Sequence, residues 1–226
     1  MSLDRKSEIA VNLLEVHERI ASAAAKAGRD PVDIKLIVVT KTFPITDLQS
    51  LYDLGVREFG ENRDQEASEK VGLLPADINW HFQGQIQSNK LKSITGWATC
   101  IHSIDQLKYA KLVSEFAGNQ RKSIFIQVSL DQIPESRGGV DPAKLVELAN
   151  GITEFANLNL MGLMAVAPLD EDTDQAFSRL SQIHSHFRES FPDAKYLSAG
   201  MSGDYESAIL HGATHLRIGS SILGNR

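Results

Sequence analysis

Residues 35–41 read Lys35-Leu36-Ile37-Val38-Val39-Thr40-Lys41, and this stretch decides the fold. Its middle residues, Leu36 to Thr40, are all apolar or β-branched, which is typical of a short strand buried on both faces. Pro44 follows closely and ends the strand. The charged Lys41 is therefore expected at the carboxyl end of a buried strand, where parallel α/β folds place their functional residues. A lysine that only reaches solvent from the strand end would give the same pattern.

Strand-like and helix-like segments alternate along the rest of the chain. Apolar residues at Ile9, Leu13, Leu14, Val16 and Ile20 predict an amphipathic helix over 4–27, ending at Gly28. The predicted strands are 35–40, 56–60, 79–83, 99–103, 123–129, 158–164, 195–199 and 214–218. The predicted helices between or after them are 45–54, 63–71, 87–95, 105–117, 141–155, 172–190 and 203–212.

This alternation indicates parallel βαβ units. Eight of them predict an α/β fold, a single (β/α)₈ TIM barrel with an extra N-terminal helix. We expect one domain over residues 1–226. Segments 79–83 and 99–103 are short and carry polar residues, so a doubly wound open sheet is the alternative if a strand prediction is wrong.

Composition excludes several classes of protein. The 226 residues carry a net charge of −6, with 42% hydrophobic and 23% charged residues, as in ordinary globular proteins. The negative charge disfavours a general nucleic-acid or anionic-membrane binder, and no apolar run approaches the roughly 18 residues of a membrane span. The polar N-terminus is unlike a signal peptide, and Cys100 is the only cysteine, which excludes an intramolecular disulfide. We expect a cytoplasmic protein with no nucleic-acid or membrane partner and no metal.

Glycine and serine follow the last two predicted strands. Ser202 comes after strand 195–199, and Gly219 and Ser220 come after strand 214–218. Backbone amides and hydroxyls at such positions, leading into helices, favour an anion, and (β/α)₈ enzymes bind phosphate there. These residues are predicted phosphate ligands, although ordinary turns and helix caps use the same residue types.

A lysine amine and a phosphate site on one rim suit a ligand that carries both an aldehyde and a phosphate. Pyridoxal phosphate (PLP) is such a ligand, because its aldehyde forms a Schiff base with lysine. Arg217 lies two residues before Gly219, so both face the same side of the last strand. An arginine keeps its proton and would donate to an unprotonated ring nitrogen, unless it only forms a rim salt bridge.

Several segments in order resemble the pyridoxal phosphate homeostasis protein (YggS/PROSC) family, which is similar in fold to the N-terminal barrel of alanine racemase. The segments that carry the resemblance are residues 39–44, 59–66, 80–90, 162–164, 197–204 and 217–224. The resemblance implies that Lys41 is the Schiff-base lysine and that Ser202, Gly219 and Ser220 hold the phosphate. It also implies that Arg217 faces the ring nitrogen and that Asn62 and Met201 line the pocket.

The sequence departs from the family pattern at Gln83, Ile86, Ala199 and Arg137, none of them a proposed ligand. In the family pattern a lysine is common at the position of Arg137, so the resemblance does not carry over a role for this loop, such as handling incoming or outgoing cofactor. Other residues that often carry chemistry are not expected to do so here. His81 and His102 are predicted to be polar core or rim residues, Cys100 a small buried hydrophobe, and His184 and His186 to face different sides of one helix.

A Schiff base alone does not make an enzyme. Racemisation needs a base on each face of the substrate carbon, and this chain ends at Arg226 with no sequence for the second domain that supplies one in alanine racemase. We expect a monomeric, non-catalytic PLP carrier in vitamin B6 homeostasis, with no catalytic residue and with transient apo-enzyme partners. The alternatives are a PLP-dependent amino-acid racemase and a Schiff-base aldolase acting on a sugar phosphate.

Overall fold

The predicted strands close into a barrel. The structure is a computed structural model that describes residues 4–131 and 138–225. In chain order, its strands are β1 (Lys35–Val39), β2 (Glu58–Glu61), β3 (Asn79–Phe82), β4 (Cys100–Ile104), β5 (Lys122–Gln127), β6 (Leu158–Met164), β7 (Tyr196–Ser198) and β8 (His215–Ile218). All neighbours are parallel, and β1 pairs with both β2 and β8. The predicted barrel is confirmed, and the open sheet is excluded.

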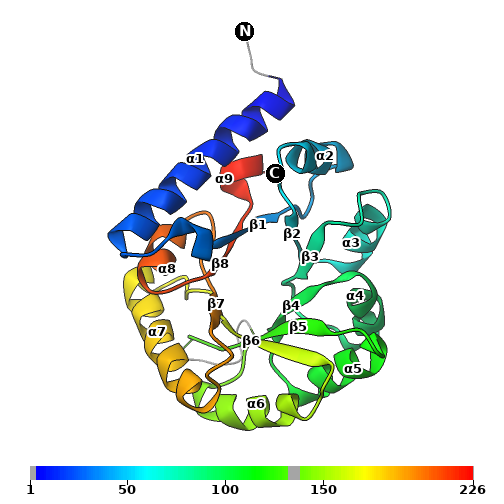
Figure 1. Ribbon diagram of the computed structural model, residues 1–226, viewed down its shortest axis with the longest axis vertical. Helices are drawn as coiled ribbons and strands as arrows, with labels where there is room; N and C mark the ends of the chain where they lie inside the picture. Colours follow the sequence, from blue (N-terminus) through cyan, green and yellow to red (C-terminus); the bar gives the residue numbers. More distant parts are fainter. Residues whose placement is uncertain (1–3, 132–137, 226) are drawn as a thin grey trace.

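Helices surround the strands (Figure 1). They are α1 (Arg5–Lys26), α2 (Ile45–Asp53), α3 (Asp64–Val71), α4 (Leu91–Trp97), α5 (Leu107–Ala117), α6 (Leu145–Thr153), α7 (Thr173–Ser190), α8 (Tyr205–Leu210) and α9 (Ser220–Leu223). The strand predictions, including the polar segments 79–83 and 99–103, agree with the structure to within two residues at each end. The short α9 was not predicted, because four residues carry no measurable periodicity.

The extra helix α1 lies outside the ring and holds the end of the chain. It begins after Asp4, whose carboxylate accepts a hydrogen bond from the Ser7 N–H, and Gly28 follows its end with a φ of +65°. Asn12 Nδ2 donates to Ile222 O at 3.0 Å, and Arg5 Nη2 donates to Leu223 O at 2.8 Å. These bonds fix α9, which follows β8 directly.

One prediction for α1 is wrong. Ile9, Leu13, Val16 and Ile20 are buried as expected, but Leu14 is 61% exposed. Leu14 directly follows the buried Leu13, and one residue turns a helix by about 100°, which carries its side chain off the packed face.

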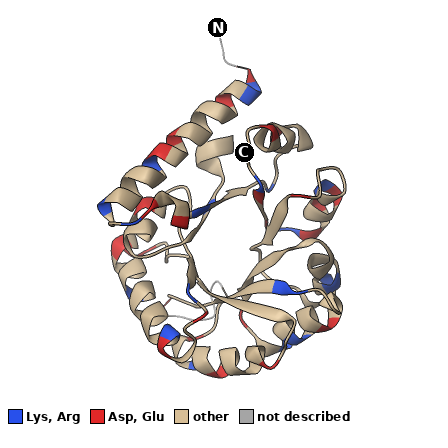
Figure 2. Cartoon of the chain, in the orientation of Figure 1, with Lys and Arg blue, Asp and Glu red and all other residues tan. Residues whose placement is uncertain are grey.

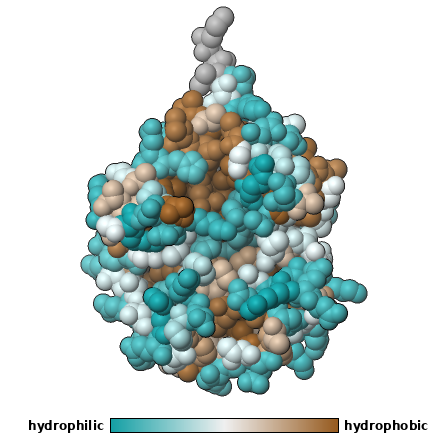
Figure 3. Space-filling model, viewed as in Figure 1, coloured by the Kyte–Doolittle hydropathy of each residue, from teal (hydrophilic) through white to brown (hydrophobic). Residues whose placement is uncertain are grey.

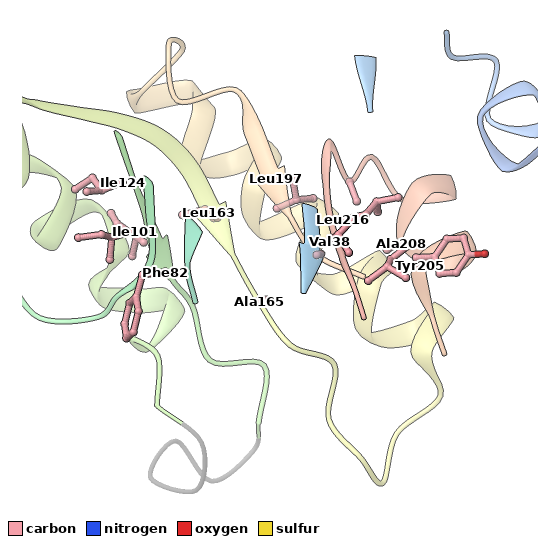
Figure 4. Packing of buried hydrophobic residues seen from close by; sticks show 14 of the residues in the cluster. Val38, Phe82, Ile101, Ile124, Leu163, Ala165, Leu197, Tyr205, Ala208 and Leu216 are labelled. Carbon is pink, nitrogen blue, oxygen red and sulfur yellow. The ribbon is translucent and has the colours of Figure 1, made fainter. Parts of the chain in front are cut away.

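The main core lies between the outer face of the strands and the helices. Figure 4 shows Val38 of β1 and Leu216 of β8 beside Tyr205 and Ala208 of α8, and all four are buried. Interior positions form a second, smaller cluster of Cys100, Phe125 and Met164. Cys100 is buried as predicted, and burial raises the pKa of its thiol.

Charged residues lie mostly on the outer helices and at strand ends (Figure 2). On the face seen in Figure 3 hydrophilic residues predominate, while hydrophobic surface gathers below the N-terminus and near the centre. Within residues 4–131 and 138–225, none of the helices combines the length and the apolar character that crossing a membrane requires.

Candidate functional site

One cavity gathers the predicted site residues at the carboxyl end of the strands. Its volume is about 500 Å³. The predicted residues that line it are Lys41, Asn62, Met201, Ser202, Arg217, Gly219 and Ser220. They follow β1, β2 and β7, or lie at the end of β8 and the start of α9. The structure therefore brings all seven together, while their individual roles remain predictions.

Gln83, Met164 and Val166 also line this cavity and were not among the predicted residues. They follow or end β3 and β6, so their place at a strand end was the available signal. The same three residues line a neighbouring cavity of about 450 Å³, which extends towards Asp105 and Tyr109. The two cavities therefore share a wall.

Lys41 is exposed in a turn between β1 and α2. The preceding Thr40 is fully buried, and its hydroxyl donates to Glu61 Oε1 at 2.6 Å. The following Thr42 has a φ of +67°, a left-handed conformation that is strained for a β-branched residue. The backbone conformation is therefore constrained on both sides of Lys41.

A charged cluster of the buried Lys70 and Glu61 and the partly buried Glu66 holds this turn. Lys70 Nζ donates to Thr40 O at 2.7 Å, to Glu61 Oε1 at 2.8 Å and to Glu66 Oε1 at 2.6 Å. Glu66 Oε1 also accepts the Thr42 N–H. The Lys70 cluster thus forms hydrogen bonds with Thr40 and Thr42, the two neighbours of Lys41, and so fixes the position of the Lys41 backbone.

Burial raises the pKa of Glu61, opposed by the hydrogen bonds from Lys70 and Thr40. Glu61 is fully buried, and its Oε2 has no hydrogen-bond partner among the described residues. The role of Lys70 could not be predicted from the sequence, because a lysine near the end of a helix is usually solvated. Only the docking of α3 against β2 brings it beneath Thr40.

The serine and glycine residues form a cradle that lines the same cavity as Lys41. Ser202 Oγ accepts the N–H of Gly219 at 3.3 Å and that of Ser221 at 3.2 Å. A Cβ on Gly219 would lie 3.1 Å from Val39 O and 3.2 Å from Val39 Cβ. Glycine therefore allows the start of α9 to approach β1 closely.

Arg217 forms the polar floor of the cavity. It is only 5% exposed, and its guanidinium donates to Ser198 Oγ at 2.8 Å and to Ala165 O at 2.9 Å. Burial lowers the pKa of Arg217 to about 10, with Asp204 opposing the shift, so the side chain is charged at neutral pH. Within the described part of the chain no carboxylate forms an ion pair with it. A buried cation held by neutral acceptors favours a ligand with negative charge or a free lone pair.

Two further polar atoms of the cavity lack partners. Asn62 Oδ1 and Gln83 Oε1 are buried and accept no hydrogen bond from any described residue. Buried polar atoms are rarely left without a partner in proteins, so these acceptors indicate a site for a polar ligand or water. The cavity therefore combines an amine, a cation, two amide side chains and a serine–glycine cradle.

The residues set aside in the sequence behave as predicted. His81 and His102 are buried side chains of the barrel interior. His184 is buried and hydrogen-bonded to Ala194 O, whereas the side chain of His186 is exposed. Arg137 lies outside the described residues.

Comparison with known proteins identifies the family. Residues 11–226 match the model of the alanine racemase N-terminal domain. The pyridoxal phosphate homeostasis protein of Mycobacterium tuberculosis is 40% identical over 245 residues, covering 99% of this chain and 95% of the relative. That of Escherichia coli is 34% identical over 229 residues, covering 97% of each. The chain belongs to the pyridoxal phosphate homeostasis protein family.

Solved structures agree with this membership. PipY of Synechococcus elongatus with PLP bound is 31% identical with a TM-score of 0.80, covering 92% of this chain and 100% of PipY. Alanine racemase of Corynebacterium glutamicum has a TM-score of 0.74 at 12% identity, covering 96% of this chain and 60% of the racemase, which shows a shared fold. The resemblance of the sequence to the homeostasis protein family, and of its barrel to alanine racemase, is confirmed.

Proposed function

We propose that this protein binds pyridoxal phosphate as a Schiff base on Lys41 and takes part in intracellular PLP homeostasis without catalytic turnover. The observation that carries the proposal is the single cavity that joins Lys41, the Ser202–Gly219–Ser220 cradle and the buried Arg217. The names of relatives at 34–40% identity and the PLP-bound PipY structure support it.

Each side chain of the cavity has a role that fits its position. When bound, PLP supplies an aldehyde that a primary amine can attack, and Lys41 is the exposed amine of the cavity. The hydroxyls of Ser202 and Ser220 suit a phosphate, and the Gly219 N–H, which donates to Ser202 Oγ, orients the Ser202 hydroxyl. Arg217 keeps its proton and donates to the ring nitrogen, while Asn62 and Met201 line the remaining wall.

A lack of turnover is supported by the ionisable groups of the cavity. Among the described residues that line it, only Lys41 and Arg217 ionise, and no carboxylate, tyrosine, histidine or cysteine accompanies them. Racemisation needs a base on each face of the substrate carbon. The guanidinium of Arg217 keeps its proton at neutral pH and therefore cannot accept one. A racemase and a sugar-phosphate aldolase remain the alternatives that an assay must separate.

The proposal extends to the setting in which the protein works. It acts as a single-domain monomer in the cytoplasm and passes PLP transiently to apo-enzymes. Light scattering during purification checks the monomer, and incubation of the loaded protein with a purified apo-enzyme checks the transfer of PLP.

A spectroscopic titration tests the proposal. PLP is added to the wild type, to Lys41→Ala and to Lys92→Ala. Lys92 is an exposed lysine of α4 that does not line the cavity, and its variant is the control. The wild type and the control are expected to give the same saturable visible band, which borohydride bleaches, and Lys41→Ala none. A wild type that stays colourless would overturn the proposal and favour the aldolase. Turnover of D- or L-alanine by the loaded wild type would favour the racemase.

A further inference from the structure

The barrel interior is unusually polar. Branched aliphatic side chains normally fill a (β/α)₈ barrel. Here β3, β4, β7 and β8 contribute His81, His102, Ser198, His215 and Arg217, and all five are at most 5% exposed. Burial of polar groups is costly unless they are paired. The proposed cofactor site uses only Arg217 among them, so the others need a separate explanation.

Four of these side chains form one continuous row of hydrogen bonds. Arg217 Nη1 donates to Ser198 Oγ at 2.8 Å, and Ser198 Oγ lies 2.9 Å from His102 Nδ1. His102 Nε2 lies 2.8 Å from His81 Nδ1, and His81 Nε2 lies 2.6 Å from Glu58 Oε2. Glu58, the first residue of β2, also accepts from Lys35 Nζ at 2.8 Å. The row therefore runs from the cavity to the opposite end of the strands.

With both histidines neutral, the two ends of the row set the direction of every bond between them. Arginine can only donate, and an ionised carboxylate can only accept. Ser198 must then accept from Arg217 and donate to His102 Nδ1. His102 in turn donates from Nε2 to His81, and His81 donates from Nε2 to Glu58. This arrangement satisfies every link with both histidines neutral and with their protons on Nε2.

The electrostatics of the interior agree with this assignment. Burial lowers the pKa of His81, with the hydrogen bond to Glu58 opposing it, and burial lowers the pKa of His102 further. Burial tends to raise the pKa of Glu58, but hydrogen bonds from His81 and Lys35 outweigh it and lower the pKa to about 2. The remaining ionisable groups that act on the two histidines are Lys35, His215 and Arg217. Neutral histidines between an ionised Glu58 and a charged Arg217 follow.

We infer that Ser198, His102, His81 and Glu58 form a positioning relay that holds Arg217 in the orientation needed to donate to the PLP ring nitrogen. The inference rests on the proposed function. Ser198 and the Ala165 carbonyl each take one N–H of the guanidinium, which fixes its plane and leaves its other N–H groups free for the cavity. Each donor in the row is polarised by the next acceptor. Glu58 therefore strengthens the hydrogen bond that Ser198 Oγ accepts from Arg217.

A metal site is the competing explanation for the same residues. Ligand atoms of His81, Cys100 and His102 lie within 4.8 Å of one another, and all three residues are buried. The two facing ring nitrogens, however, already form a hydrogen bond with each other. Burial raises the pKa of the Cys100 thiol, which disfavours the thiolate that a metal requires. The row of hydrogen bonds accounts for the histidines without an ion.

The relay is tested first in the protein without PLP. Nitrogen-15 NMR of labelled histidine is expected to show His81 and His102 neutral at neutral pH, with the proton on Nε2 in both. Ser198→Ala should change the His102 Nδ1 resonance. The Nδ1 resonance of His215 should stay unchanged, because this nitrogen bonds with Thr214 Oγ1. A charged His102, a proton on its Nδ1, or stoichiometric zinc in the purified protein would overturn the relay whether or not PLP binds.

The effect on the cofactor is tested with matched variants. His102→Leu breaks two links and His102→Gln can restore both, whereas His215→Leu removes a buried histidine that also packs on Phe125 but lies outside the row. Ser198→Ala and His102→Leu are expected to weaken PLP binding about tenfold and to shift its absorption band, since a hydrogen bond to a charged group is lost. His102→Gln should recover most of the affinity, and His215→Leu should keep it.

The outcomes separate the two proposals. Equal PLP affinity and spectra in the wild type, Ser198→Ala and His102→Leu would overturn the relay but leave PLP binding intact. A wild type that shows the expected histidine tautomers and yet binds no PLP would instead overturn the proposed function. If His102→Leu fails to fold, the PLP affinity of Ser198→Ala and the nitrogen-15 spectra of the histidines still test the relay.

Discussion

The two faces of the barrel strands differ in composition and in what they do. Outer positions such as Val38 and Leu216 are apolar and pack against helices, whereas inner positions such as His102, Ser198 and Arg217 are polar and bond to one another. The outer face supplies the hydrophobic free energy of folding. The inner face positions a charged side chain at the cavity. Substitutions on the two faces should therefore have separable effects on stability and on PLP binding.

The largest effect is expected on the outer face. Phe59 is fully buried and packs edge-to-face against Trp80 with ring centroids 5.4 Å apart. Phe59→Ala should lower the free energy of unfolding by about 4 kcal/mol, through lost burial and a cavity. PLP affinity of the folded fraction should stay unchanged. Denaturant unfolding and PLP titration check both parts, and a large loss of affinity at full folding would contradict the separation of the faces.

The Lys70 cluster is a polar exception on the outer face. Lys70→Met leaves Glu61 and Glu66 without their cation and should destabilise the protein by about 3 kcal/mol. Adding Glu61→Gln should recover part of the stability, because one buried negative charge is removed. Lys92→Met is the surface control. Equal stability of Lys70→Met and the control would contradict a stabilising role for the cluster.

An interior substitution should affect PLP far more than folding. Arg217→Met removes a buried charge that no described carboxylate pairs with, and this gain offsets the cost of leaving the Ser198 and Ala165 acceptors without a donor. PLP binding should weaken by about 2 kcal/mol, or roughly 30-fold, through the lost charged hydrogen bond. Cys100→Ala alters the same interior without touching the cavity and should keep the affinity. Unchanged binding by Arg217→Met would contradict the role of the inner face.

Glu58, at the end of the barrel interior opposite the cavity, should make the stability of the protein depend on pH in acid. The pKa of Glu58 is lowered to about 2 in the folded protein, below its unfolded value, so its stabilising effect is full above about pH 4.5 and is lost as the pH falls towards 2. Glu58→Gln should therefore flatten the acid limb of the stability curve in that window, by about 1 to 2 kcal/mol. Glu189→Gln, an exposed carboxylate of α7, is the control. Identical acid limbs in the two variants would exclude this role for Glu58.

The two faces also explain what could be predicted from the sequence. All eight strands could be predicted from segments that alternate with helices, the clearest being the apolar run 36–39 in β1, because burial on the outer face leaves a local pattern. The cavity residues could be predicted because Lys41, Ser202 and Gly219 follow strands, and parallel strands end on one rim. These positions depend only on strand order.

The relay and the Lys70 cluster could not be predicted in the same way. The bond between His81 and His102 depends on the register of β3 and β4, and the bond from Ser198 to His102 crosses the barrel. Single histidines in strand segments look like ordinary core residues, which is how they were interpreted. Such contacts become visible only when the barrel closes.

The most direct test of the central claim locates the bound PLP. The PLP-loaded wild type is reduced with borohydride and digested, and the modified peptide is sequenced by mass spectrometry. The structure predicts one stoichiometric pyridoxyl group, on Lys41, with Lys35, Lys70 and Lys90 unmodified. A group on another lysine, or none in a protein that binds PLP tightly, would contradict the assignment of Lys41 and of the cavity built around it.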